Sequence, residues 1–260
     1  MPRGAALITG ASAGIGAELA RLCAAGGYPL ILVARSTDRL NELASGLSGS
    51  HGISARALAA DLADPAAPAA IFEQTRGENI ELLINNAGIG ARGAFAEIDW
   101  AVEAEMIQIN VVALAHLTRL FLPGMISRGS GRILNIASTA AYVPGPFMAV
   151  YYASKAFVLS LSEALANEVA GTGITVTVVA PGPTRTDFAA RAGVTGTNLF
   201  RGSTMSAADV AREAYAAMMA GKTEHIAGAR NRWMMRGARL APRTMLAQAT
   251  RKLNSPTGRF

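Results

Sequence analysis

The sequence predicts an α/β protein, a doubly wound three-layer sandwich around a central, mostly parallel sheet of about seven strands. Short apolar runs alternate with longer stretches whose apolar residues are spaced three and four apart. The short runs are almost continuously apolar, which is typical of parallel strands covered on both faces. Repeated strand–helix alternation implies right-handed crossovers and helices on both sides of the sheet. The predicted strands cover residues 5–9, 30–34, 53–58, 82–85, 132–137, 174–180 and 224–227.

The stretches between these strands have helical spacing, as in "GAELARLCAAG", "DRLNELASGL" and "SLSEALANEVA". A chain of 260 residues that is 51% hydrophobic can bury the core of one such domain. No linker rich in Pro, Gly or Ser divides it. We therefore assign residues 1–228 to one domain and residues 229–260 to a basic C-terminal extension of that domain.

The basic charge of the chain is concentrated in this extension. Of the 24 Lys and Arg, eight lie from His225 onward, where there is no Asp or Glu, leaving 16 basic against 18 acidic residues. The extension is interpreted as solvated, as packed against another subunit, or as attracted to anionic lipid or another acidic partner. Its apolar residues between arginines would let it lie on a lipid surface. A nucleic-acid partner is disfavoured, because no aromatic stacking platform accompanies the charge.

Cysteine and histidine usage excludes several kinds of site. Cys23 is the one cysteine, so the chain has no internal disulfide, and the three histidines have no metal-ligand spacing. The start "MPRGAALITG" lacks a signal-peptide layout, and no apolar run reaches the roughly 18 residues that span a bilayer. We expect a cytoplasmic protein without a metal site.

A glycine-rich loop, "TGASAGIG" (residues 9–16), connects the first predicted strand to the first helix. Glycines let the backbone approach a ligand, and the following helix N-terminus presents free N–H groups to a phosphate. A simple strand–helix turn is the alternative. Its position after the first strand favours a nucleotide site.

The loop spacing resembles T-G-x-x-x-G-x-G of the short-chain dehydrogenase/reductase family. Four further features occur in the order of that family: "NNAG" at 85–88, Asn110, Ser138 and the pair Tyr151/Lys155, followed by "PGPTRTDF" at 181–188. The resemblance covers residues 4–228 and implies a Rossmann-type fold and an oxidoreductase that acts on CH–OH groups, of carbonyl reductase type. It also implies a homodimer or homotetramer, formed through the helices near 100–125 and 150–170.

By resemblance, Asp61 contacts the adenine, Thr184 the nicotinamide carboxamide, Thr186 the pyrophosphate and Lys155 the nicotinamide ribose. The complete set of cofactor-binding residues that we predict is Gly10, Ser12, Gly14, Ile15, Gly16, Arg35, Asp61, Leu62, Asn86, Ala87, Gly88, Tyr151, Lys155, Pro181, Gly182, Thr184 and Thr186.

The end of the second strand favours NADP(H) over NAD(H). NAD enzymes usually place an acidic residue there to bind the ribose 2′-hydroxyl, and this chain has Ala34 followed by Arg35. A guanidinium can hold a 2′-phosphate through two hydrogen bonds. Arg35 as a solvated loop residue is the alternative.

Two adjacent tyrosines precede the lysine in "YYASK". Helical spacing lets Lys155 neighbour Tyr151 or Tyr152, and the family motif Tyr-x-x-x-Lys selects Tyr151. We expect Tyr152 to be a packing residue. A nearby ammonium, together with an oxidised nicotinamide ring when one is bound, should depress the pKa of the Tyr151 phenol. In the reductive direction the phenol then donates a proton to a carbonyl oxygen while Ser138 hydrogen-bonds the same oxygen. The predicted catalytic residues are Asn110, which by resemblance positions a relay water, Ser138, Tyr151 and Lys155.

Two stretches should border the substrate: "STAAYVPGPFMAV" after Ser138 and the loop at 189–205, which is rich in glycine and could close as a lid. Their side chains are mostly apolar and predict a hydrophobic carbonyl or alcohol substrate, unless they only pack the loop. The residues named for this wall are Tyr142, Val143, Phe147, Met148, Leu199, Phe200 and Met205, with Arg191 and Arg201 as the charges.

Three other functions compete with this interpretation. A non-catalytic NADP-binding sensor is disfavoured by the intact Ser138, Tyr151 and Lys155. A membrane-surface or interaction protein would depend on the extension. A methyltransferase would share a glycine loop without needing the Tyr-x-x-x-Lys pair.

Overall fold

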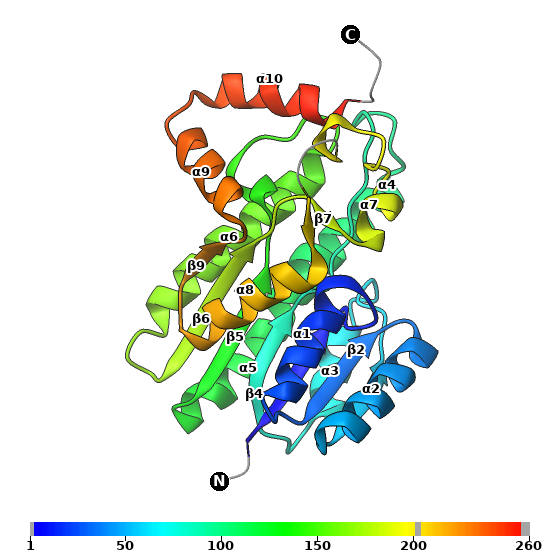
Figure 1. Ribbon diagram of the computed structural model, residues 1–260, viewed down its shortest axis with the longest axis vertical. Helices are drawn as coiled ribbons and strands as arrows, with labels where there is room; N and C mark the ends of the chain where they lie inside the picture. Colours follow the sequence, from blue (N-terminus) through cyan, green and yellow to red (C-terminus); the bar gives the residue numbers. More distant parts are fainter. Residues whose placement is uncertain (1–2, 201–203, 256–260) are drawn as a thin grey trace.

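The computed structural model describes residues 3–200 and 204–255 and contains a seven-stranded sheet in which every neighbouring pair is parallel. The strand order is β3-β2-β1-β4-β5-β6-β9 (Figure 1). This confirms the predicted doubly wound, three-layer α/β fold. The strands are β1 Ala5–Thr9, β2 Leu30–Ala34, β3 Ala55–Ala59, β4 Ile80–Asn85, β5 Gly131–Ile136, β6 Ile174–Ala180 and β9 Glu224–Ile226.

Helices cover both faces of the sheet, as the apolar strand runs require. All five residues of β1 are buried, because its alternate side chains contribute to the two main core clusters. The layer on one face is formed by α1 (Gly14–Ala25), α2 (Thr37–His51) and α8 (Ala207–Met219). The layer on the other face is formed by α3 (Ala67–Gln74), α4 (Trp100–Ile107), α5 (Leu114–Arg128) and α6 (Ala149–Glu168).

Local chemistry sets the ends of several helices. Asp99 caps α4, since its side chain accepts a hydrogen bond from Ala101 N at 2.9 Å. Ser206 caps α8 in the same way through Asp209 N, at 3.0 Å. The αL residue Gly52, with φ of 64°, ends α2.

The apolar stretch from Trp100 to Arg128 forms one helical run of 29 residues, in which α4 and α5 are joined by a π-helical segment, η1 (Gln108–Ala113). By length and composition it could cross a membrane. Here its inner side, including Leu117 and Met125, belongs to the core beside β4 and β5. The run therefore serves as a core helix of the sandwich.

Two features were not anticipated from the sequence. A second, two-stranded parallel sheet pairs β7 (Thr184–Arg185) with β8 (Met205–Ser206) and so joins the two ends of the long loop after β6. That loop contains the short helices α7 (Asp187–Arg191) and η3 (Asn198–Phe200). The C-terminal extension forms two helices, α9 (Ala229–Ala238) and α10 (Arg243–Asn254), at the end of the molecule opposite the N-terminus (Figure 1).

Candidate active site

The chain reverses its direction of winding between β1 and β4, which are neighbours in the sheet. Ligands of doubly wound proteins bind in the crevice outside the carboxyl ends of the strands at this point. Here the crevice is a cleft of ≈ 290 Å³, and it reaches from the glycine loop to the loop after β6. Of the predicted cofactor and catalytic residues, all but Gly16 and Asn110 line it.

The glycine loop is held in place by the loop after β4. Gly10 and Gly14 have φ of 66° and 57°, conformations that favour glycine. Asn86 Nδ2 donates to Thr9 O at 3.0 Å and to Gly10 O at 3.2 Å, and Thr9 Oγ1 accepts from Asn86 N and Ala87 N. The two loops are therefore hydrogen-bonded into one unit at the floor of the cleft.

Gly16 was predicted to contact the cofactor and instead packs behind the loop. A Cβ at this position would lie 2.3 Å from Gly10 O and 2.5 Å from Asn86 Nδ2. The space is needed because the first turn of α1 approaches the backbone of β1. The requirement for glycine here comes from this close packing.

We expect Gly16→Ala to lower the free energy of unfolding by about 1–3 kcal/mol, since the backbone of Gly10 must shift. Gly46→Ala is the matched control, because Gly46 lies inside α2 with nothing within 4 Å of its would-be Cβ. That change should be neutral or stabilise by up to about 1 kcal/mol. Urea unfolding measures both, and equal stability of Gly16→Ala and wild type would contradict the packing role.

Asn110 lies in the π-helical segment η1, is 1% exposed and does not line the cleft. Its Nδ2 donates to Ile89 O at 2.9 Å and to Ser154 Oγ at 3.0 Å, and its Oδ1 accepts from Ile89 N at 3.0 Å. Both side-chain N–H groups are thus used within the protein. The predicted positioning of a water gains no support from them, and Asn110 instead ties the loop after β4 to α6.

Ser138, Tyr151 and Lys155 come together in the cleft. Ser138 follows β5, and its hydroxyl donates to Pro181 O at 3.4 Å and accepts from Ala140 N at 3.1 Å. It also lies close enough to the Tyr151 phenol to lower the pKa of that phenol. Lys155 is buried one turn beyond Tyr151 on α6, and its Nζ donates to Ile136 O at 3.0 Å. The Nζ lies 5.9 Å from the centre of the Tyr151 ring.

The expected depression of the Tyr151 pKa is not found with the groups of the protein alone. Burial raises the pKa of Tyr151 to about 12, and the hydrogen bond from Ser138 lowers it by less. Burial also lowers the pKa of Lys155 to about 8. Loss of water around the phenol outweighs the ammonium, which is 5.9 Å from the ring centre and hydrogen-bonded to Ile136 O. A depressed pKa therefore needs the second positive charge, that of an oxidised nicotinamide, as well as Lys155.

Tyr152 is buried, as predicted, and also lines the cleft. Its ring centre is 6.0 Å from that of Tyr151, and its hydroxyl donates to Asn254 Oδ1 at 3.2 Å. Asn254 lies at the end of α10 and is fully buried. Sequence patterns did not indicate this contact, because it joins residues 102 positions apart.

The substrate end of the cleft differs in part from the predicted wall. Met148, Leu199 and Arg191 line it. Tyr142, Val143, Phe147 and Met205 do not: the Tyr142 hydroxyl donates to Glu224, and Phe147 lies under the guanidinium of Arg251. The Phe200 side chain and Arg201 lie outside the described residues. The additional apolar lining residues are Ala140, Tyr152, Phe188 and Val194.

Arg35 lines the other end of the cleft, with a side chain that is 58% exposed and 3.8 Å from Glu105 Oε1. An ion pair this exposed contributes little, so the guanidinium can exchange it for a phosphate. Ser36 lies beside it at the start of α2, and its hydroxyl makes no cap hydrogen bond. Sequence analysis missed Ser36, although a serine before a helix is a recognisable signal.

Comparison with known proteins agrees with this geometry. The sequence profile of the short chain dehydrogenase family matches residues 4–195. The chain belongs to the short-chain dehydrogenase/reductase family. This confirms the family resemblance.

Curated relatives of this dehydrogenase/reductase include a ketoacyl reductase, HetN, from Nostoc sp., 38% identical over 178 residues. A very-long-chain 3-oxoacyl-CoA reductase from Phaeosphaeria nodorum is 41% identical over 185 residues. Each match covers 68% of this chain but only 62% and 54% of the relatives, so the dehydrogenase/reductase spans less than two thirds of their length.

Solved structures match over nearly the full length. A short-chain dehydrogenase from Sphingobium yanoikuyae in complex with NADPH is 36% identical, with a TM-score of 0.81, over 91% of this dehydrogenase/reductase and 94% of that chain. A structure from work on 7beta-hydroxysteroid dehydrogenase stereoselectivity is 25% identical, with a TM-score of 0.87, over 95% and 96% of the two chains.

Proposed function

We propose that this chain reduces a hydrophobic ketone or aldehyde to an alcohol with NADPH, with Tyr151 as the general acid. The observation that carries the proposal is the buried Tyr151 phenol, which shares a cleft at the switch point of the sheet with Ser138 and with buried Lys155. When bound, the reduced nicotinamide supplies the hydride.

The charges of the protein suit Tyr151 as the acid of the reductive step. With its pKa raised to about 12, Tyr151 carries its proton at neutral pH and can donate it to the carbonyl oxygen. Ser138 Oγ would hydrogen-bond the same oxygen and stabilise the negative charge that develops on it. Lys155, with a pKa of about 8, remains mostly protonated at pH 7 and favours the phenolate left after proton transfer.

The cleft fits a dinucleotide. Gly10 and Gly14 have positive φ, so the backbone of the loop turns where a side chain would be strained, and α1 begins at Gly14. The Thr186 methyl lies 3.1 Å from the would-be Cβ of Gly14, facing the loop that would hold the pyrophosphate. Lys155 Nζ lies 3.3 Å from the would-be Cβ of Gly88, at the nicotinamide end.

NADP(H) is proposed over NAD(H) because Arg35 borders the cleft with an exchangeable partner and Ala34 replaces the usual acidic residue. We expect Arg35→Asp to raise KM for NADPH by about 10- to 100-fold, because the 2′-phosphate would lose a charged hydrogen-bonding partner. The same variant should use NADH better than wild type does. Arg76→Asp, an exposed position away from the cleft, is the control. Steady-state kinetics with both cofactors decide this, and an unchanged preference would contradict the assignment.

The substrate class is proposed from the apolar end of the cleft, where Met148, Phe188 and Val194 stand near Tyr151. Several similar proteins are named for carbonyl or alcohol substrates: a 3-oxoacyl-CoA, a 7beta-hydroxysteroid, which is an alcohol, and the bulky-bulky ketones of an alcohol dehydrogenase from Comamonas testosteroni. These names support a long-chain or polycyclic ketone for this chain. The alternative of a non-catalytic NADP-binding sensor would not need Ser138, Tyr151 and Lys155 together in the cleft.

We also propose that the chain forms a homo-oligomer and that it is located in the cytoplasm. Val112, Ile126 and Phe157 are exposed apolar residues of η1, α5 and α6, the helices expected to pair in a homodimer or homotetramer. A cytoplasmic location is consistent with a cysteine that is free and buried.

The experiment that tests the function measures NADPH oxidation with a panel of hydrophobic ketones and aldehydes. We expect turnover of at least one bulky ketone, with formation of the alcohol in equal amount. Binding of NADPH can be followed by quenching of the protein fluorescence. If NADPH binds but is not oxidised with any compound of the panel, the result would favour a non-catalytic NADP-binding sensor and contradict the proposed function.

A further inference from the structure

Each of the two helices of the C-terminal extension is held against the body of the protein on one side by hydrogen bonds. On α10, two residues spaced four apart face the stretch that follows Ser138. Thr250 Oγ1 donates to Pro144 O, and Asn254 Nδ2 donates to Pro146 O at 2.9 Å. Both are buried. The opposite side of α10 is therefore held outward, away from the body of the protein.

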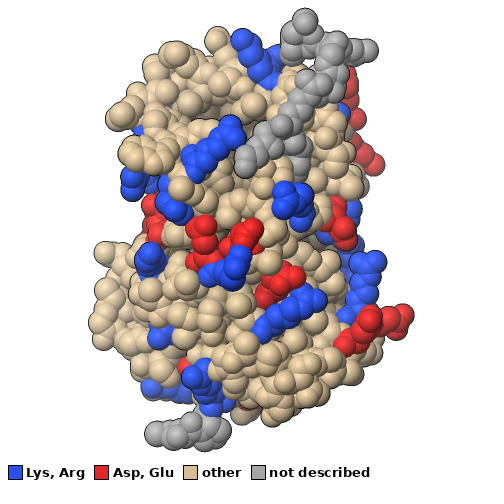
Figure 2. Space-filling model, viewed as in Figure 1, with Lys and Arg blue, Asp and Glu red and all other residues tan. Residues whose placement is uncertain are grey.

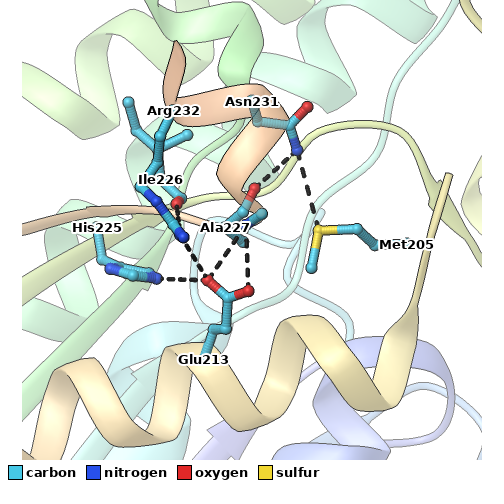
Figure 3. A network of polar contacts seen from close by, with 8 residues as sticks. Met205, Glu213, His225, Ile226, Ala227, Asn231 and Arg232 are labelled. Atoms are coloured by element: carbon cyan, nitrogen blue, oxygen red, sulfur yellow. Dashed lines mark hydrogen bonds and ion pairs between the residues drawn. The ribbon is translucent and has the colours of Figure 1, made fainter. Parts of the chain in front are cut away.

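The start of α9 is fixed by a polar network around Glu213 of α8 (Figure 3). Glu213 accepts hydrogen bonds from His225 Nε2 at 2.7 Å, from Arg232 Nη1 at 3.0 Å and from the backbone N–H of Gly228. Burial alone would raise the pKa of Glu213, but these bonds together hold it below its usual value. The carboxylate thus stays charged and anchors α9 to β9 and α8.

The outer sides of these helices carry large apolar side chains in solvent. Trp233 is 72% exposed, Leu240 in the turn between the helices 90%, and Met245 60%. Met234 and Leu253 are also exposed. These five are nearly half of the eleven exposed large hydrophobic residues found in the described part of the chain, although they occupy only residues 233–253. A cluster of this kind marks an interaction surface.

The same outer sides are basic. Arg232 and Arg239 pair with Glu213 and Glu224. Within residues 3–200 and 204–255, Arg230, Arg236, Arg243, Arg251 and Lys252 form no ion pair. Figure 2 shows blue and tan atoms over α9 and α10, whereas blue and red alternate across the middle of the same face. Arg251 is directed to the body of the protein, where its guanidinium lies over the Phe147 ring. We call the five apolar side chains, together with Arg230, Arg236, Arg243 and Lys252, the α9–α10 face.

We propose that the α9–α10 face docks on an anionic lipid surface. Exposed Trp, Leu and Met beside unpaired Arg and Lys suit a helix lying in the headgroup region, with apolar groups inserted and cations on lipid phosphates. A second copy of this chain is a poorer occupant, because a two-fold contact would place the same acid-free basic face against itself.

The α9–α10 face adjoins the substrate end of the cleft. Asn198 Nδ2 donates to Lys252 O at 3.1 Å, and the next residue, Leu199, lines the cleft. Tyr152, which also lines it, hydrogen-bonds Asn254. Docking would bring the mouth of the cleft to the lipid surface, from which a hydrophobic carbonyl could enter. The docking itself does not depend on the proposed oxidoreductase function.

The test is sedimentation of the full chain with vesicles of phosphatidylcholine alone or mixed with phosphatidylglycerol. We expect binding to the mixed vesicles that weakens as salt is raised. The variant Arg236→Glu/Arg243→Glu/Lys252→Glu should lower the partition coefficient on the order of a hundredfold or more. The control Arg21→Glu/Arg76→Glu/Lys222→Glu changes the net charge equally at exposed sites elsewhere and should retain most of the binding.

Insertion into the lipid can be followed through the fluorescence of Trp233. The chain has two tryptophans, so the variant Trp100→Phe has Trp233 as its single tryptophan. Its emission should shift to the blue on mixed vesicles. The proposal is overturned if wild type does not sediment with mixed vesicles at low salt, if both triple variants lose binding equally, or if Trp233 emission does not change. It is also overturned if wild type does not bind vesicles and light scattering without lipid shows that wild type is an oligomer whereas the first triple variant is not. The α9–α10 face would then be a contact between copies of this chain. Reduction of a water-soluble ketone should persist in that variant, which separates failure of docking from failure of the proposed function.

Discussion

Tyr151→Phe is expected to lower kcat for reduction of a hydrophobic ketone by NADPH at least about a hundredfold, the low end of what general acid catalysis supplies. The phenol is the group that the protein keeps protonated in the cleft, with its pKa raised to about 12. Phenylalanine keeps the ring contact with Phe188, at 5.4 Å between centres, and removes only the proton donor. KM should therefore change much less than kcat.

Tyr152→Phe is the matched control, since it removes the neighbouring hydroxyl from the same turn of α6. We expect near wild-type kcat and a loss of about 1–3 kcal/mol in the free energy of unfolding, because Asn254 Oδ1 loses its donor in a buried place. If Tyr152→Phe abolished turnover while Tyr151→Phe remained fully active, the assignment of the acid would be wrong.

Lys155→Met is expected to lower kcat/KM on the order of a hundredfold, the usual effect of losing one electrostatic group from an active site. The same change should raise the stability of the cofactor-free protein. Burial lowers the pKa of Lys155 from 10.5 to about 8, so holding it charged costs about 3 kcal/mol at pH 7. The lost hydrogen bond to Ile136 O offsets part of that gain.

The stability difference between Lys155→Met and wild type should depend on pH in a defined direction. Between about pH 8 and 10.5 the folded lysine has lost its proton and the unfolded one retains it, so the wild type gains stability as the pH rises. The advantage of the methionine variant should shrink across that window and stay constant below it. Denaturant unfolding at pH 7 and pH 9.5 measures this. A variant less stable than wild type at pH 7 would show that the buried charge is not costly.

The sheet could be predicted from the sequence because its strands are short, apolar and buried on both sides. Runs such as "LILVA" and "ITVTVVA" coincide with β2 and β6. Six boundaries moved by one or two residues: β3 and β4 begin two residues away from their predicted starts, β3 ends one residue later, β5 begins and ends one residue earlier, and β9 ends one residue earlier. Pairing with a neighbouring strand rather than hydropathy sets these limits. Motif spacing also placed Ser138, Tyr151 and Lys155 in one cleft.

What could not be predicted depends on long-range contacts or on burial. The pairing of Thr184 with Met205 in the small sheet and the bond from Tyr152 to Asn254 join residues without any local pattern. The direction of the Tyr151 pKa depends on how far the fold excludes water, which neighbours in sequence do not reveal. The close approach of Gly16 to Gly10 O is likewise a contact that the glycine motif did not reveal.

The central claim is that the Tyr151 phenol hands its proton to a carbonyl oxygen as hydride arrives from a reduced nicotinamide. The most direct measurement is deuterium transfer from NADPH labelled at the nicotinamide C4 position to a hydrophobic ketone, with the product analysed by mass spectrometry. The label should appear on the carbinol carbon with wild type and Tyr152→Phe, and at least about a hundredfold more slowly with Tyr151→Phe. Transfer by Tyr151→Phe at the wild-type rate would contradict the account.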